Sequence, residues 1–203
     1  MFILKYYLFA GVNGSGKSFL YNRLKLTDTG VRINSDEIVQ TLGHWSDIKV
    51  QFQAGKKAVQ LIRDCIQKRV TFNQETTLTG YSIVKNIKET KRIGYKIIMF
   101  YIYLHSPIIA FQRIEQRVLN GGHGVSETDV KKRFKTSLDN LSRVGSLCDT
   151  LRIYDNSSVM TEMYNRVNGE LLLFNKNMPE IVLNAVKQQQ FEWEEHKKQT
   201  RLD

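Results

Sequence analysis

The stretch that most constrains the fold of this chain is a glycine-rich run of eight residues, Gly11-Val12-Asn13-Gly14-Ser15-Gly16-Lys17-Ser18. It matches every fixed position of the GxxxxGK[ST] pattern, and it stands between an apolar, strand-like run and an amphipathic one. In such a loop the backbone N–H groups turn inward around phosphate oxygens, and the positive end of the following helix adds to the attraction. The sequence therefore predicts a strand, a phosphate-binding loop and a helix in that order, forming a site for a nucleoside triphosphate.

The loop also assigns roles to individual residues. We expect Lys17 to reach the β- and γ-phosphates and Ser18 to hold Mg²⁺ through its hydroxyl group. ATP and Mg²⁺ are thus the expected cofactors. The residues expected to bind the nucleotide are Gly11, Val12, Asn13, Gly14, Ser15, Gly16, Lys17, Ser18 and Phe19. Because GTPases, motor ATPases and small-molecule kinases share this loop, it leaves the reaction open.

Short apolar runs and longer amphipathic runs alternate along the 203 residues, a length that suits a single domain, 1–203. Runs rich in β-branched and aromatic residues predict strands at Phe2–Ala10, Val31–Asn34, Val70–Asn73, Lys96–Leu104 and Leu151–Tyr154. Amphipathic runs predict helices at Lys17–Leu26, Ala54–Arg69, Tyr81–Ile93, Pro107–Asn120, Glu127–Leu141 and Met178–Gln199. The alternation predicts an α/β fold of the P-loop NTPase type: a parallel sheet of about five strands with helices on both faces. We expect a helical lid over residues 106–143 and a C-terminal helix within 175–203.

Composition excludes several other classes of protein. With 41% hydrophobic and 25% charged residues, the chain is neither disordered nor a disulfide scaffold. Its longest apolar run, Ile97–Leu104, is far below the roughly 20 residues of a membrane-spanning helix. Residues 1–10 lead into the glycine-rich loop and not into a cleavage site, so they predict a buried strand and no signal peptide. Cys65 and Cys148 are interpreted as packing residues of a protein in the reducing cytoplasm.

The net charge of +10 is concentrated in residues 81–143, which hold 12 basic and 5 acidic residues. Such an excess suits a phosphate-bearing substrate, nucleic acid or an anionic membrane surface, and it also fits a solvated basic face. Aromatic residues are not interleaved with a basic run, and no zinc-finger spacing occurs. We therefore expect a small-molecule partner, keep nucleic acid as a minor alternative, and expect no membrane partner.

The residues after the second expected strand favour a kinase. A GTPase needs an NKxD-type motif that recognises guanine, but the nearest string, Asn175-Lys176-Asn177-Met178, lacks the acidic residue. A motor ATPase usually has an apolar strand that ends in two adjacent acidic residues, and no expected strand ends in this way. Asp36 follows that second strand on the same sheet edge as the phosphate loop, where a carboxylate can accept the proton of an attacking hydroxyl. The alternative is that Ser35 or Asp36 caps the next helix, and for Glu37 we favour a structural role of this kind.

The third expected strand is followed by Asn73-Gln74-Glu75-Thr76-Thr77. Glu75 and Thr77 can face the same cleft, and a carboxylate beside a hydroxyl group suits the hydroxyls of a sugar or polyol. Glu75 can alternatively hold Mg²⁺ through water. A third interpretation is a turn in which the threonines satisfy local backbone groups.

A basic segment with a glycine break indicates the lid. Arg113 and Arg117 lie four residues apart on one expected helix, Gly121-Gly122-His123-Gly124 interrupts it, and Lys131-Lys132-Arg133 follows on the next. Cations that arrive on closure can offset the charge of a transferring phosphoryl group. We expect Arg117 and Arg133 to be catalytic and Arg113 to contact the substrate, although each can also be a solvated surface residue. His123 either contacts the substrate or caps the preceding helix.

With these residues in place, the sequence resembles the zeta toxin family of P-loop kinases, in particular its short, stand-alone bacterial members. The resemblance spans roughly residues 5–160 and is carried by the motifs quoted above: the glycine-rich loop, Asn34-Ser35-Asp36-Glu37, Asn73–Thr77, Arg117, Gly121-Gly122-His123 and Arg133. It implies an ATP-dependent kinase whose best studied members phosphorylate a hydroxyl of UDP-N-acetylglucosamine and act as toxins held by an antitoxin. On that pattern Lys17 binds phosphate, Ser18 binds Mg²⁺, Asp36 is the base, Glu75 and Thr77 hold the sugar, and the lid arginines stabilise the transferring group.

We therefore predict a cytoplasmic kinase that transfers the γ-phosphate of ATP to a hydroxyl of a sugar-nucleotide-like acceptor, UDP-N-acetylglucosamine first, with an antitoxin as a possible protein partner. Two alternatives stay open. One is a P-loop kinase for another acceptor, such as a nucleotide, a polynucleotide end or an antibiotic hydroxyl. The other is a non-catalytic ATP-binding module that regulates a partner, with the charged final helix as its docking surface.

Overall fold

The computed structural model describes residues 3–24, 26 and 29–199. Within these residues one sheet contains β1 (Lys5–Ala10), β2 (Val31–Ile33), β3 (Phe72–Thr76), β4 (Lys96–Tyr103), β5 (Thr150–Asp155), β6 (Thr161–Val167) and β7 (Glu170–Phe174). The helices are α1 (Lys17–Leu24), α2 (Ser35–Leu42), α3 (Ile48–Lys68), α4 (Ser82–Arg92), α5 (Pro107–Leu119), α6 (Glu127–Ser146) and α7 (Glu180–Gln199). The predicted α/β class is confirmed.

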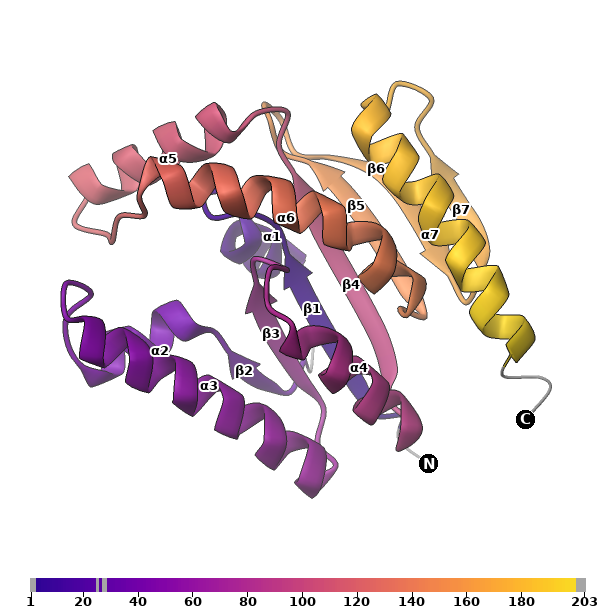
Figure 1. Ribbon diagram of the computed structural model, residues 1–203, viewed down its shortest axis with the longest axis horizontal. Coiled ribbons are helices and arrows are strands. Elements are labelled where there is room, and N and C mark those ends of the chain that lie inside the picture. Colours follow the sequence, from indigo (N-terminus) through magenta and orange to yellow (C-terminus); the bar gives the residue numbers. More distant parts are fainter. Residues whose placement is uncertain (1–2, 25, 27–28, 200–203) are drawn as a thin grey trace.

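The strand order, β2-β3-β1-β4-β5-β6-β7, places the strand before the glycine-rich loop inside the sheet, between β3 and β4 (Figure 1). The first five strands in this order are parallel, as predicted. Ala10, the last residue of β1, pairs with Thr76 at the end of β3, and Ile33 at the end of β2 pairs with Gln74. The loops that follow these three strands therefore begin at one edge of the sheet, which is where ligands of such folds bind.

Three elements were not predicted from the sequence. β6 and β7 extend the sheet by an antiparallel hairpin. Their sequences lack the alternation of polar and apolar residues that marks a strand. In β6 an arginine, Arg166, is fully buried, and in β7 a run of apolar residues is exposed. The third element, α2, has only eight residues, too few for a clear helical period. The predicted start of α3 is wrong by six residues, because the exposed Ile48 and Phe52 obscure the amphipathic pattern of its first turns.

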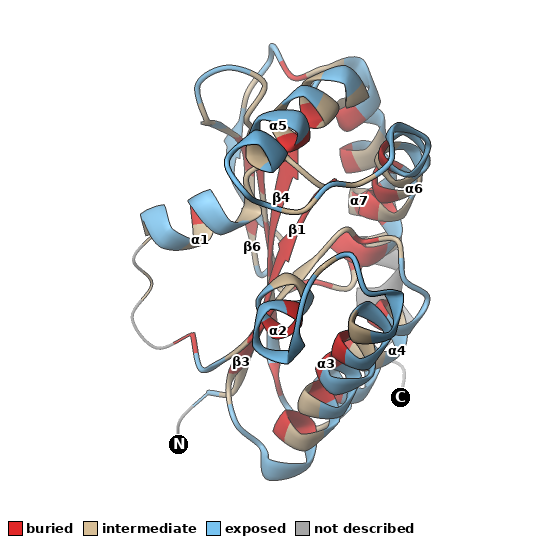
Figure 2. Ribbon diagram, turned by 90° about the vertical axis from the view of Figure 1, so that its left-hand side faces the viewer, coloured by how far each residue is buried: buried red, intermediate tan, exposed pale blue. Residues whose placement is uncertain are grey.

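Helices cover both faces of the sheet, but unequally. Tyr6, Leu8 and Met99 face the main core, which α2, α3, α4, α6 and α7 cover. Phe9 and Phe100 face a smaller cluster closed by α1. Figure 2 shows α1 on one side of the buried strands and α3, α4, α6 and α7 on the other. The two cysteines are free and buried, as expected of packing residues.

The final helix packs against the body of the protein. Val182, Val186 and Gln189 of α7 are buried. Arg166 of β6 donates to the carbonyl oxygens of Gly145 (2.9 Å) and Cys148 (3.0 Å), at the end of α6. Residues 200–203 of the charged segment that we considered a docking surface lie outside the described residues. In the part that is described, no helix is long and apolar enough to cross a membrane.

Candidate active site

The glycine-rich loop joins β1 to α1, as the sequence predicts. Gly14 and Gly16 have φ angles of +76° and +98°, which favour glycine. A Cβ atom on Gly16 would lie 2.4 Å from Nδ2 of Asn156, and this amide nitrogen donates to the carbonyl oxygen of Ser15 (2.8 Å). The loop after β5 thus buttresses the phosphate loop from the side.

Lys17 occupies the first position of α1. Its ammonium group donates to the carbonyl oxygens of Gly11 (3.0 Å) and Val12 (3.1 Å), at the mouth of the loop. Desolvation lowers the pKa of Lys17, although Glu75 and Asp36 act in the opposite direction. The ammonium group therefore lies against the first two residues of the glycine-rich loop.

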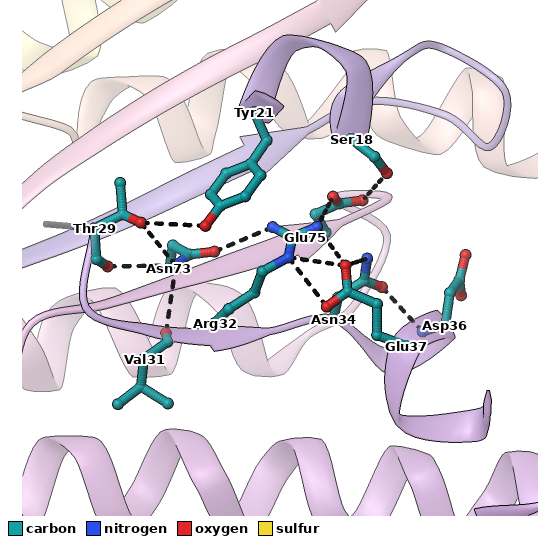
Figure 3. Close-up of polar contacts among 10 residues, drawn as sticks. All are labelled: Ser18, Tyr21, Thr29, Val31, Arg32, Asn34, Asp36, Glu37, Asn73 and Glu75. Atoms are coloured by element: carbon teal, nitrogen blue, oxygen red, sulfur yellow. Dashed lines mark hydrogen bonds and ion pairs between the residues drawn. The ribbon is translucent and has the colours of Figure 1, made fainter. Parts of the chain in front are cut away.

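Ser18 and Glu75 meet beside this loop (Figure 3). The hydroxyl group of Ser18 donates to Oε2 of Glu75 (3.2 Å), while Oε1 of Glu75 accepts from Nη2 of Arg32 (2.6 Å). The side chain of Glu75 is only 7% exposed. A hydroxyl and a carboxylate oxygen are hard donors, which Mg²⁺ prefers, and Mg²⁺ commonly takes one or two protein ligands together with substrate phosphates. These two residues therefore fit a magnesium ion that arrives with a nucleotide.

Asp36 lies in the first turn of α2. The side chain of Asn34 accepts from the Asp36 backbone N–H (2.9 Å), so Asn34 is the cap of this helix and the Asp36 carboxylate is left free of that role. In Figure 3 this carboxylate points away from Arg32. Glu37 instead binds Arg32 (2.7 Å) and accepts from the Asn34 amide (3.2 Å), a structural role of the kind favoured from the sequence.

His123 closes over Asp36 from the loop between α5 and α6. Its Nε2 lies 3.3 Å from Oδ2 of Asp36, and its ring stacks on Trp45 at 3.7 Å between centroids. Burial alone would raise the pKa of Asp36, but the hydrogen bond and charge of His123, with Lys17 and Arg117, outweigh burial and lower it. Asp36 is therefore ionised at neutral pH. Asn120, and not His123, ends the preceding helix.

The three arginines predicted to belong to a lid, Arg113, Arg117 and Arg133, have separate partners. Arg117 donates to the backbone oxygen of His123 through Nε (3.1 Å) and Nη2 (2.8 Å), and thereby fixes the Gly-Gly-His turn. Arg133 of α6 donates to Oδ1 of Asn13 (3.0 Å) in the phosphate loop. Arg113 donates to the backbone oxygen of Asn156 (2.7 Å), the residue that follows β5.

The remaining expected site residues lie at the margin. The hydroxyl of Thr77 pairs with that of Thr79 (2.8 Å). The neighbouring Thr76 hydroxyl accepts from the backbone N–H of Leu78 (3.0 Å), which is the kind of local backbone contact that the sequence left open. Phe19 of α1 is exposed. The structure thus brings Lys17, Ser18 and Glu75 together around the loop.

A cavity of about 690 Å³ opens beside Asp36. The charged residues of its lining are Asp36, Asp129 and Arg133, and the others are neutral or aromatic: Asn13, Gln40, Gly43, His44, Trp45, Ser46, Gln51, Gly121, Gly122, His123, Gly124, Val125 and Ser126. This volume lies within the range of small-molecule sites. Among the described residues, no group of three or more His, Cys, Asp or Glu side chains is arranged to hold a metal ion.

Sequence reasoning missed two residues of the site, Arg32 and Trp45. Arg32 lies inside a three-residue strand, and its partner Glu75 is more than 40 residues away. Trp45 lies in the irregular segment between α2 and α3, and its ring stacks on His123 in the lining of the cavity. An aromatic residue shortly after the Asn-Ser-Asp-Glu segment was the available signal for Trp45, whereas no local pattern marks Arg32.

Comparison with known proteins gives a family and a fold. A family model described as Zeta toxin matches residues 5–168. An uncharacterized protein of Haemophilus influenzae (strain ATCC 51907 / DSM 11121 / KW20 / Rd) is 33% identical over 126 residues, which cover 62% of this chain and 89% of that protein.

Two solved assemblies have similar folds. A chain of the AvrRxo1-ORF1:AvrRxo1-ORF2 complex with sulphate ions has a TM-score of 0.70 and 16% identity, over 89% of this chain. This chain spans 63% of that one, less than two thirds of its length. The same complex with ATP gives a TM-score of 0.64 at 15% identity, over 85% of this chain and 61% of the other. A chain of the PezAT chromosomal toxin–antitoxin system of Streptococcus pneumoniae has a TM-score of 0.59 and 16% identity, over 95% of this chain and 87% of that one.

Proposed function

This chain belongs to the zeta toxin family, and from that premise we propose that it is a kinase that transfers the γ-phosphate of ATP to a hydroxyl group of a small molecule. The observation that carries the proposal is the position of Asp36. Its carboxylate borders the cavity of about 690 Å³, whose lining also includes Asn13 of the phosphate loop. An acceptor hydroxyl in that cavity can meet a base and a γ-phosphate at once.

In the proposed reaction each residue acts on a defined atom. Asp36 accepts the proton of the acceptor hydroxyl, which its lowered pKa allows because the carboxylate is ionised at neutral pH. The ammonium group of Lys17 binds phosphate oxygens, and Arg133 contacts the transferring group from α6. Ser18 and Glu75 would hold Mg²⁺, which when bound neutralises charge on the phosphates.

We propose UDP-N-acetylglucosamine as the first acceptor to test. Family membership and the size of the cavity support it, because a sugar nucleotide is within the usual range of such sites. The cavity lining favours a second candidate, an uncharged hydroxyl compound, because it offers one arginine and two carboxylates. The diphosphate of a sugar nucleotide would need cationic groups besides this arginine, and these would have to lie outside the cavity lining.

We also propose that a protein antitoxin binds this chain. Its support is family membership together with the likeness of the fold to a chain of the PezAT toxin–antitoxin system. A ligand or protein that covers the cavity beside Asp36 would block the acceptor and leave the fold unchanged.

The experiment is mass spectrometry of acceptors after incubation with the purified chain, Mg²⁺ and ATP. The acceptors are UDP-N-acetylglucosamine, free N-acetylglucosamine and a set of neutral polyols and nucleosides, each also incubated with Asp36→Asn. One added phosphate on an acceptor, absent with the variant, is the expected result. ATP bound with micromolar affinity but no phosphorylated product from any acceptor would favour the non-catalytic module instead.

A further inference from the structure

Arg32 is the most extensively bonded side chain of the site, and none of the roles proposed above uses it. Its Nε donates to Glu37 (2.8 Å), its Nη2 to Glu75 (2.6 Å) and its Nη1 to the side chain of Asn73 (3.3 Å). The guanidinium carbon also lies 3.9 Å from the centre of the Tyr21 ring. These partners come from three elements, α1, α2 and β3, and Figure 3 shows the polar contacts from α2 and β3 meeting at Arg32 on β2.

The partners of Arg32 hold its guanidinium group in place. Asn73 is fully buried, and its amide nitrogen donates to the backbone (3.3 Å) and hydroxyl (3.2 Å) oxygens of Thr29, so its oxygen is aimed at Arg32. The hydrogen bonds to Glu37 and Glu75 outweigh burial and raise the pKa of Arg32. The guanidinium group is therefore a permanent cation with a single orientation.

We propose that Arg32 is a positioning residue for metal binding: it holds one oxygen of Glu75 so that the other faces Ser18 and the metal ion of the bound nucleotide. The inference rests on the proposed function, since it requires a metal–nucleotide substrate. It assigns Arg32 an effect on the metal through Glu75, without contact to the nucleotide or the acceptor.

The geometry explains why an arginine is required. Oxygens of Glu37 and Glu75 both lie within 2.7 Å of the same nitrogen, Nη2 of Arg32. Without that cation two carboxylates would face each other, and Glu75 would turn away from its neighbour or toward a cation bound between the two. A lysine can neutralise one carboxylate, but its single ammonium group cannot bond Glu37, Glu75 and Asn73 in the planar arrangement of a guanidinium group.

Arg32 has two opposing effects on a metal ion. It orients Glu75, which strengthens binding, and it withdraws negative charge from Glu75, which weakens binding. The proposal states that orientation prevails. Partners that orient a metal ligand typically contribute 10- to 100-fold to metal affinity, so removal of Arg32 should weaken binding by about that factor.

The test measures metal binding and not turnover. Free Mn²⁺ is followed by electron paramagnetic resonance during titration of the whole chain saturated with a non-hydrolysable ATP analogue, for the wild type, Arg32→Gln and Arg32→Lys. The matched control is Arg152→Gln, which breaks a similar arginine–glutamate pair (Nε–Oε1 2.6 Å, Nη2–Oε2 2.8 Å, to Glu162) on β5 and β6. Thermal unfolding of every variant shows that the titrated chains are folded.

We expect Arg32→Gln to weaken Mn²⁺ binding at least about tenfold, Arg32→Lys to recover only part of that loss, and Arg152→Gln to bind as the wild type does. Equal or tighter binding by folded Arg32→Gln would overturn the positioning role, as would full recovery by lysine, and either result leaves the kinase proposal intact. A wild type that binds neither the analogue nor Mn²⁺ would instead refute the proposed function, and with it this inference.

Discussion

Replacement of His123 by alanine should loosen the wall of the cavity at Asp36. The imidazole ring is 8% exposed and makes two contacts that alanine cannot make: the stack on Trp45 and the approach to Asp36. Arg117 binds the backbone oxygen of residue 123, which alanine also has, so the hydrogen bonds that hold the turn are kept in the variant. The variant thus tests the two side-chain contacts separately from the loop.

The expected loss follows from these contacts. A stacked pair of rings contributes about 0.5–1.5 kcal/mol beyond the area that it buries. A hydrogen bond to a charged group contributes about 1.5 kcal/mol or more when well formed. At 3.3 Å, and with the Asp36 side chain 40% exposed, we expect well under half of that from this one. The free energy of unfolding should fall by about 1–2 kcal/mol, and Tm by about 2–8 °C for a chain of this length.

The assay is thermal unfolding followed by tryptophan fluorescence. In a Trp193→Phe background Trp45 is the only tryptophan of the chain, so its emission reports directly on loss of the stack. His44→Ala is the matched control, because His44 lines the same cavity but is exposed, and its side chain bonds only to nearby Ser46 among the described residues (2.8 Å). The control should change stability by less than about 0.5 kcal/mol. If His123→Ala behaved like this control in both stability and emission, the stack and the Asp36 contact would have no energetic weight.

Three further predictions concern Asp36, Gly16 and Arg133. The pKa of Asp36 is lower in the folded than in the unfolded protein, so its ionised carboxylate stabilises the fold fully above a pH of about 4 and loses this effect as the pH falls through the folded-state pKa. Tm of Asp36→Asn should therefore fall less with acid than Tm of the wild type. Gly16→Ala would place a Cβ atom against Asn156 at a φ angle of +98°, so the affinity for ATP, measured by calorimetry, should fall at least about tenfold. Unchanged affinity would contradict the inference that Asn156 supports the loop. Arg133→Ala should lower kcat by at least about tenfold with a smaller change in ATP affinity; the reverse pattern would make Arg133 a nucleotide anchor.

Local sequence patterns predicted the features that depend on local chemistry. The glycine-rich loop is a contiguous motif whose backbone conformation is set by its own glycines, so its place between β1 and α1 could be predicted. Asp36 was found because strand ends in a parallel sheet share an edge, a topological rule that needs no side-chain detail.

Features that depend on distant partners could not be predicted in the same way. Arg32 is an ordinary surface arginine by sequence, and only the register of β2 with β3 brings it to Glu75. Arg166 makes the sequence of β6 look polar. Its burial could not be predicted, because the carbonyl groups that it binds lie at the end of α6, about 20 residues earlier in the chain. The arginines of α5 and α6 were assigned from their charge, the glycine break between the two helices and the family resemblance, whereas the position of each follows from the backbone oxygen or amide that it binds.

The most direct test of the central claim is phosphoryl transfer from γ-labelled ATP in the presence of Mg²⁺, measured in a single turnover with a pooled set of hydroxyl acceptors. Wild-type protein, Asp36→Asn and Lys17→Met are compared, with folding of each verified by thermal unfolding. The account predicts label on an acceptor hydroxyl with the wild type, a loss of about 100-fold or more in the transfer rate with Asp36→Asn, and loss of both binding and transfer with Lys17→Met. Transfer that proceeds at the wild-type rate in Asp36→Asn would contradict the account.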